Sequence, residues 1–247
     1  HLDDKRFMER LGVPTPKNMV DVEGYLDVQS RAGIGFSVFS GPRIQEVGAE
    51  AGLDPVDVAR EYNDFAAELT ARHPDRLLGL GQAYPMGGEP MLREMERAVR
   101  DLGLRGFLIA TAYEDRMIDD PEAFPFFELC QELDVVAFVH NRGNPIGREH
   151  MADHRLVELV GNPNEMTLAA ARLIFTGVME RLPDLKLFLG RLGGAITTYA
   201  GRIQVGWETR HSRDASKNGG KVPPWGPDKL TGSFMDSLRR IHVCTQT

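Results

Sequence analysis

Short apolar runs alternate with longer amphipathic segments along most of this chain. The runs have Gly, Pro or charged residues at their ends, which predicts strands buried on both faces at residues 35–40, 77–82, 105–110, 135–140, 186–189 and 240–244. Apolar residues at helical spacing predict helices over residues 55–73, 89–102, 121–133 and 164–181. Strands that alternate with helices predict a parallel sheet, which is either open and doubly wound or closed as a (β/α)8 barrel. The pattern alone leaves both architectures open.

Local signals support these boundaries and mark two irregular segments. Asp54 before Pro55, and Asp120 before Pro121, are typical helix starts. Residues 141–164 form a loop-rich insertion after a strand, which is where a barrel builds the mouth of its active site. Residues 210–229 are rich in Gly, Pro and charge and predict a mobile loop.

Composition narrows the possible partners. The 247 residues carry a net charge of −7, which argues against nucleic acid as a partner. No apolar run approaches the roughly 18–20 residues of a membrane span, so we expect no membrane partner. Cys130 and Cys244 lie in separate apolar runs, which predicts buried thiols and a cytoplasmic location.

Histidines supply the first candidates for chemistry. His140 ends a predicted strand, where a neutral imidazole can bind Zn²⁺ or act as a general base; a histidine that only caps the strand by hydrogen bonding is the alternative. His150 and His154 are spaced as one helical turn, but the glutamate of a zincin motif does not follow the first of them. A solvated helix surface is the favoured interpretation of that pair.

Known catalytic and nucleotide-binding motifs are missing from the sequence. It contains no dinucleotide fingerprint, phosphate loop or serine nucleophile elbow. Arg191 instead stands where the apolar run 185–189 ends and the pair Gly193–Gly194 allows a turn. Arginine stays protonated at neutral pH, so this cation cannot serve as a general base.

Three segments of the chain resemble a known family. They are GLRGFLIAT, FPFFELCQELDVVAFVHNRG and NEMTLAAARLIFTGVMERLPDLKLFLGRLGGAITTYAGRI. In this order and spacing they are similar to the amidohydrolase-related group that includes aminocarboxymuconate-semialdehyde decarboxylase. The resemblance implies a single domain over residues 1–247, folded as an α/β (β/α)8 TIM barrel whose first and eighth strands are missing from the sequence.

The resemblance also implies roles for particular residues. His140 matches a metal-binding histidine, although Asn141 replaces the proline that usually follows, and His1 matches the end of a first-strand ligand motif or is the remnant of an affinity tag. Arg191 falls on the family's acid/base histidine. There it can bind a substrate carboxylate or stabilise negative charge. Arg202 matches an arginine that binds substrate across a dimer interface; a surface salt bridge is the alternative.

The expected function follows from these matches. The resemblance implies a hydrolase or decarboxylase of a small, possibly aromatic or unsaturated carboxylic acid, which uses a divalent metal (zinc, or manganese) and works as a homodimer. Arg191, Arg202 and Asn141 would contact the substrate, and His140 and His1 would bind the metal. The alternative is a family member in which Arg191 has replaced the acid/base, and which binds a ligand or performs metal-free chemistry.

Overall fold

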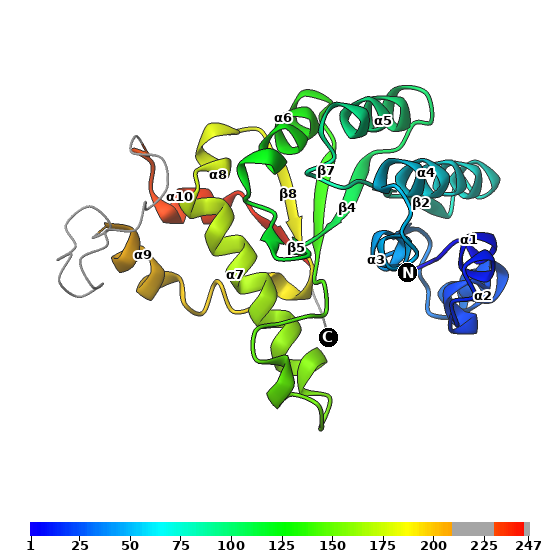
Figure 1. The fold of residues 1–247 in the computed structure, drawn as a ribbon, viewed down its shortest axis with the longest axis horizontal. Coiled ribbons are helices and arrows are strands. Elements are labelled where there is room, and N and C mark those ends of the chain that lie inside the picture. Colours follow the sequence, from blue (N-terminus) through cyan, green and yellow to red (C-terminus); the bar gives the residue numbers. More distant parts are fainter. Residues whose placement is uncertain (209–229, 245–247) are drawn as a thin grey trace. The chain divides into compact units, whose positions relative to one another are not determined.

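The computed structural model describes residues 1–208 and 230–244 (Figure 1). The mobile loop predicted at 210–229 lies outside the described residues. The chain divides into two compact units. Unit 1 is His1–Ile109 with Val135–Ala137, and unit 2 is Ala110–Asp134 with Phe138–Thr247. The single domain expected over residues 1–247 stays a prediction.

Every predicted strand segment contains strand structure. The strands are β1 (Ser37–Phe39), β2 (Leu77–Gly79), β3 (Gly81–Gln82), β4 (Gly106–Ala110), β7 (Val136–His140), β8 (Lys186–Leu189) and β9 (His242–Val243). One sheet has the order β3-β4-β7-β8-β9, and β1 pairs with β2 separately. The pairs β1–β2, β3–β4 and β8–β9 are parallel, as the alternating pattern predicts. The segment predicted at 77–82 is two strands, because its first part pairs with β1 and its second part with β4.

The helices of unit 1 are α1 (Lys5–Arg10), α2 (Val22–Arg31), α3 (Ile44–Glu50), α4 (Pro55–Arg72) and α5 (Gly88–Arg100), with a short 3-10 helix at Lys17–Met19. The Asp54 carboxylate accepts hydrogen bonds from the backbone N–H groups of Val56 and Asp57, which confirms the predicted cap of α4. The apolar face of α4 packs on β2 and β3. It includes the buried residues Val58, Tyr62, Ala66 and Leu69.

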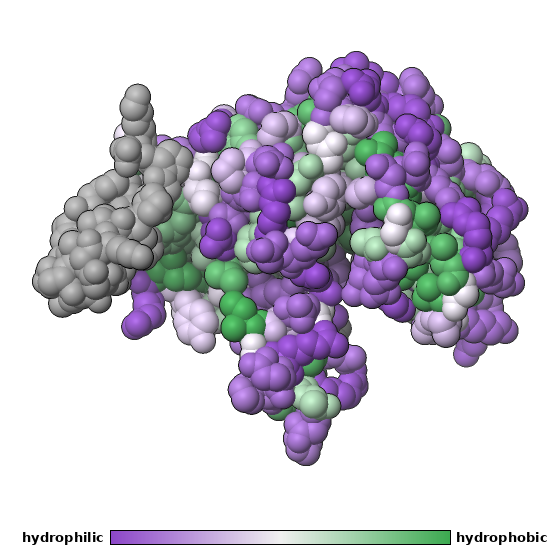
Figure 2. Space-filling view, in the orientation of Figure 1, coloured by the Kyte–Doolittle hydropathy of each residue, from purple (hydrophilic) through white to green (hydrophobic). Residues whose placement is uncertain are grey.

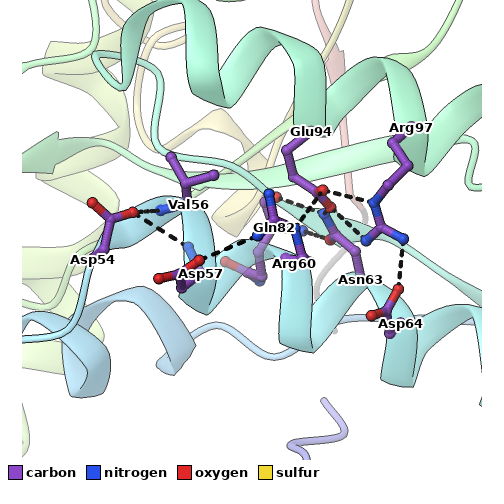
Figure 3. A network of polar contacts seen from close by, with 9 residues as sticks. All are labelled: Asp54, Val56, Asp57, Arg60, Asn63, Asp64, Gln82, Glu94 and Arg97. Atoms are coloured by element: carbon purple, nitrogen blue, oxygen red, sulfur yellow. Dashed lines mark hydrogen bonds and ion pairs between the residues drawn. The ribbon is translucent and has the colours of Figure 1, made fainter.

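A buried carboxylate links α4 and α5 (Figure 3). Glu94 is 2% exposed, and its two oxygens accept hydrogen bonds from Arg97 Nε at 2.8 Å and Arg97 Nη2 at 2.9 Å. Asn63 donates to the same carboxylate at 2.9 Å, and its own side-chain oxygen accepts from the Gln82 backbone at 2.7 Å. The network therefore joins both helices to strand β3.

Unit 2 contains the helices α6 (Phe124–Glu132), α7 (Asn162–Phe175), α8 (Val178–Arg181), α9 (Ala200–Glu208) and α10 (Phe234–Arg239). The helix predicted at 164–181 is two helices, because Gly177 adopts φ 83° between α7 and α8. A π-helix at Val157–Gly161 runs directly into α7, and the hairpin β5 (Ala112–Tyr113) and β6 (Arg116–Met117) was not predicted. Short 3-10 helices occur at Pro121–Ala123, Arg148–His150 and Arg191–Gly193.

The polar surface agrees with the composition of the chain, and one of the two cysteines is buried as predicted. Hydrophilic residues cover most of the face seen in Figure 2, as expected for a chain with 26% charged residues. Among the described helices, none is both long enough and apolar enough to cross a membrane. Cys130 is buried as predicted, whereas Cys244 is only partly buried at the end of β9.

Candidate active site

His140 is the last residue of β7, and its ring is oriented by the chain that follows it. Its Nδ1 lies 2.8 Å from the backbone oxygen of Asn141. A carbonyl oxygen only accepts hydrogen bonds, so Nδ1 carries the proton and the neutral ring has its lone pair on Nε2. Burial lowers the pKa of His140, and the nearby positive charge of Arg191 lowers it further, against the opposing effect of the Asn141 hydrogen bond. The ring is therefore held neutral, the form that binds a metal.

Asn141 and Arg191 join the loops that follow β7 and β8. Arg191 Nε donates a hydrogen bond to Asn141 Oδ1 at 3.2 Å, and Asn141 is 8% exposed. With Nε engaged, the Nη groups of Arg191 form the end of the guanidinium that can grip a carboxylate in two-point fashion. The structure thus brings together three of the predicted site residues, His140, Asn141 and Arg191.

The backbone at Arg191 is unusual for residues that are not glycine. Arg191 has φ 51° and Leu192 has φ 58°, and both Gly193 and Gly194 have φ 68°. Left-handed backbone at two successive side-chain-bearing residues is unfavourable and persists where the surroundings enforce it. This turn places the arginine side chain beside Asn141.

Helix α7 packs against this turn and restricts its backbone conformation. Thr167 Oγ1 accepts a hydrogen bond from the Ala195 backbone at 2.7 Å. A Cβ at Gly194 would collide with the Pro163 carbonyl oxygen and with the Thr167 side chain. Of the glycine pair singled out in the sequence, Gly194 is thus required by a close approach of two backbones.

Arg202 lies on the exposed surface of α9. Among the described residues its side chain makes no hydrogen bond or ion pair, so nothing in the structure assigns it a partner or a role. Its role as a substrate contact stays a prediction.

His1 belongs to unit 1, and an unpredicted carboxylate lies near it in sequence. The ring of His1 is exposed, with Nδ1 3.4 Å from Ser40 Oγ. Asp3 is 2% exposed, and both of its carboxylate oxygens lack a hydrogen-bond partner among the described residues. Burial raises the pKa of Asp3 to about 6, against the opposing charge of Arg43. The only sequence signal for this group is the acidic pair Asp3–Asp4, which resembles any solvated segment.

His150 and His154, in the insertion after β7, are not arranged to bind a metal together. His150 ends a 3-10 helix and His154 has φ 54°, so no helix carries both, contrary to the helical spacing that the sequence indicates. Their side chains are 84% and 80% exposed beside Glu149 and Asp153. The prediction that both histidines are solvent-exposed is therefore correct. The prediction that they lie on one helix is wrong.

The donor atoms fit a divalent cation in their chemistry. In unit 2, His140 offers an imidazole with its lone pair on Nε2. In unit 1, taken by itself, Asp3 is a buried carboxylate whose oxygens lack a hydrogen-bond partner among the described residues, a group that a cation would stabilise. Within the described residues, no three His, Cys, Asp or Glu side chains gather closely enough to hold a metal. The described cavity of about 600 Å³ in unit 2 is lined by other residues, including Asp119, Arg172 and Arg181.

Fold and site together define an α/β protein of parallel strands whose polar side chains gather where strands β7 and β8 end. Residues 32–215 match the amidohydrolase family, and the chain belongs to that family.

Relatives and solved structures agree with this assignment. A 2-amino-3-carboxymuconate-6-semialdehyde decarboxylase of Dictyostelium discoideum is 35% identical over 186 residues, which cover 75% of this chain and 50% of that protein. The structure of a 5-carboxyvanillate decarboxylase from Sphingomonas paucimobilis superposes with a TM-score of 0.76 at 28% identity, covering 92% of this chain and 67% of that one. A dihydroxybenzoic acid decarboxylase from Polaromonas, solved with manganese and 2-nitroresorcinol, has a TM-score of 0.72 at 23% identity, covering 98% and 75%, and shows the shared fold.

These likenesses confirm the predicted fold class, an α/β barrel of the amidohydrolase type. The chain spans about half the length of the Dictyostelium relative that it matches. The proteins named above are decarboxylases, and the comparisons give no support to the alternative of a binding protein with altered chemistry.

Proposed function

We propose that this chain carries the site of a divalent-metal-dependent decarboxylase acting on a small aromatic or unsaturated carboxylic acid. The observation that carries the proposal is the cation Arg191, fixed by Asn141 beside the neutral ring of His140 where strands β7 and β8 end. The decarboxylase names of the family relatives support this reaction over hydrolysis.

Arg191 would bind the substrate carboxylate. Decarboxylation breaks the bond between a carbon and its carboxylate, leaves the electron pair on that carbon and adds a proton there. Because Arg191 does not release a proton at neutral pH, its contribution is electrostatic: it holds the carboxylate and stabilises negative charge. The Asn141 amide keeps the guanidinium in place.

His140 and His1 are the residues that we propose as metal ligands. A bound divalent cation, zinc or manganese, would supply positive charge that polarises the substrate. Manganese is supported by its presence in the Polaromonas structure, and zinc by the imidazole donors. A homodimer in which Arg202 reaches a neighbouring site, and a cytoplasmic location, complete the proposal.

The test is turnover by the metal-loaded protein. Protein supplied with Zn²⁺ or Mn²⁺ is incubated with 2,6-dihydroxybenzoate, with 5-carboxyvanillate and with 2-amino-3-carboxymuconate semialdehyde, and CO₂ release is measured. We expect release from at least one of them. Arg191→Ala should lower kcat/KM by roughly 100-fold or more, because it removes two hydrogen bonds to a charged group, each worth about 1.5 kcal/mol or more.

Arg155→Ala is the matched control, because Arg155 is an exposed arginine that pairs with Glu158. It should leave turnover unchanged. Metal analysis of His140→Ala, which should bind less metal than the unmodified protein, tests the ligand separately. Metal-loaded protein that releases no CO₂ from any of the three acids would contradict the proposed reaction.

A further inference from the structure

Glu165 is a buried carboxylate whose hydrogen bonds converge on the chain after His140. It lies in the first turn of α7 and is 9% exposed. Glu165 Oε1 accepts from Thr111 Oγ1 at 2.5 Å and from the Arg142 backbone N–H at 3.0 Å, and Oε2 accepts from the Gly143 backbone N–H at 3.2 Å. Its donors are a hydroxyl and two successive backbone amides, all uncharged.

One peptide unit connects this carboxylate to His140. The N–H of Arg142 and the C=O of Asn141 belong to the same planar peptide group. Glu165 holds the N–H end, and the C=O end accepts the Nδ1–H of His140 at 2.8 Å. The carboxylate, the peptide and the imidazole therefore form a continuous hydrogen-bonded chain.

This series of hydrogen bonds affects both the tautomer and the electron density of the His140 ring. A negatively charged acceptor on the N–H end polarises the peptide and makes its carbonyl oxygen a stronger acceptor. The stronger acceptor fixes the Nδ1–H tautomer and increases electron density at Nε2. Without the carboxylate, the Arg142 N–H would keep its longer hydrogen bond to Thr111 Oγ1 at 3.3 Å, but the Asn141–Arg142 peptide would lose its charged acceptor and the polarisation that this acceptor provides.

We propose that Glu165 is a positioning residue of the candidate site: it acts through the Asn141–Arg142 peptide to hold His140 in the Nδ1–H tautomer, the form in which Nε2 is the atom that binds a metal. The metal part of this assignment rests on the proposed function. The tautomer part concerns only residues of the structure itself.

The experiment compares Glu165→Ala and Glu165→Gln with a matched glutamate. Glu180 accepts backbone N–H groups from two successive residues in the same way, Thr231 at 2.8 Å and Gly232 at 3.1 Å, but neither contact leads to His140. Glu180→Ala therefore removes a similar structural clamp and leaves the chain of bonds to the imidazole intact.

The first readout is the ¹⁵N NMR spectrum of His140 in metal-free protein at about pH 8, where a free histidine is neutral. We expect the Nδ1–H tautomer in the unmodified protein and in Glu180→Ala. We expect a mixture of tautomers in Glu165→Ala. Glu165→Gln should be intermediate, because it retains one oxygen acceptor but no negative charge. The second readout is affinity for Mn²⁺ or Zn²⁺, which should fall about 10-fold or more in Glu165→Ala.

The two proposals fail in different ways. If the unmodified protein binds no metal and releases no CO₂ while Glu165→Ala shifts the tautomer, the proposed function is wrong and the positioning role stands. If folded Glu165→Ala or Glu165→Gln keeps the unmodified tautomer, the positioning role is overturned. Equal effects of Glu180→Ala and Glu165→Ala on the tautomer would also overturn it. If Glu165→Ala does not fold, Glu165→Gln alone decides between these outcomes.

Discussion

Arg191 Nε donates a hydrogen bond to Asn141 Oδ1 across 3.2 Å, and this bond ties the loop after β8 to the loop after β7. The resemblance predicts that Arg191 falls on the family's acid/base position and Asn141 on its proline position, and the structure joins these two residues directly. The Asn141 side-chain amide provides an acceptor that a proline side chain would lack at this position, so the two predicted departures from the family pattern would depend on each other.

Asn141→Ala should weaken binding of the substrate more than it slows the chemical step. The guanidinium would lose one hydrogen bond to a charged group, which corresponds to about 1.5 kcal/mol or roughly a 10-fold rise in KM. Steady-state kinetics of CO₂ release measure the change. Asn144→Ala, at an exposed position of the same loop, is the control and should leave KM unchanged. An unchanged KM in Asn141→Ala would show that the amide does not hold the arginine.

Arg191→Gln should raise the pKa of His140. Burial already lowers this pKa below its ordinary 6.5, and the Arg191 charge lowers it further, so removing the charge moves the pKa back toward 6.5 while burial keeps it below. Because the pKa of His140 is lower in the folded chain than in the unfolded chain, its contribution to stability is present above pH 6.5 and is lost as the pH falls below 6.5 through the folded-state pKa. An NMR titration of His140 in metal-free protein measures the shift, with Arg155→Gln as control. A pKa that is equal in both variants contradicts the prediction.

Arg97→Met should destabilise unit 1 by roughly 3 kcal/mol. Glu94 is 2% exposed; without its bidentate partner this buried carboxylate keeps the Asn63 hydrogen bond and a longer ion pair with Arg60 at 3.6 Å, which compensate its charge only in part. Chemical denaturation gives the free energy of unfolding. Arg93→Met on the same helix is the control, since Arg93 is 62% exposed and pairs with Glu89, a contact worth about 0.5 kcal/mol or less. Similar losses in the two variants would show that burial of the partner does not matter.

Gly194→Ala should disrupt the turn that carries Arg191. The new Cβ would collide with the Pro163 carbonyl and Thr167, and φ of 68° with ψ of −133° suits glycine alone, so we expect a loss above about 2 kcal/mol. Gly206→Ala is the opposite case: it lies within α9 in open space and should stabilise the protein by up to about 1 kcal/mol. Thermal unfolding of both variants checks the contrast. A Gly194→Ala variant as stable as the unmodified protein would refute the close approach.

The sequence by itself indicated the parallel strands and the longest helices, because apolar periodicity and helix caps such as Asp54 act through neighbouring residues. It missed the antiparallel β5–β6 hairpin and the break between α7 and α8. It also indicated His140 and Arg191, since strand ends are marked by the change from apolar to polar residues. Only the tertiary structure decided that Arg191 contacts Asn141 and that Glu165 holds the Asn141–Arg142 peptide. These contacts join residues about 20–50 positions apart, and such pairings depend on how the loops fold around α7 rather than on any local preference. The buried Glu165 and the orphaned Asp3 look like ordinary surface acids in the sequence, because burial of a charged residue leaves no periodic signal.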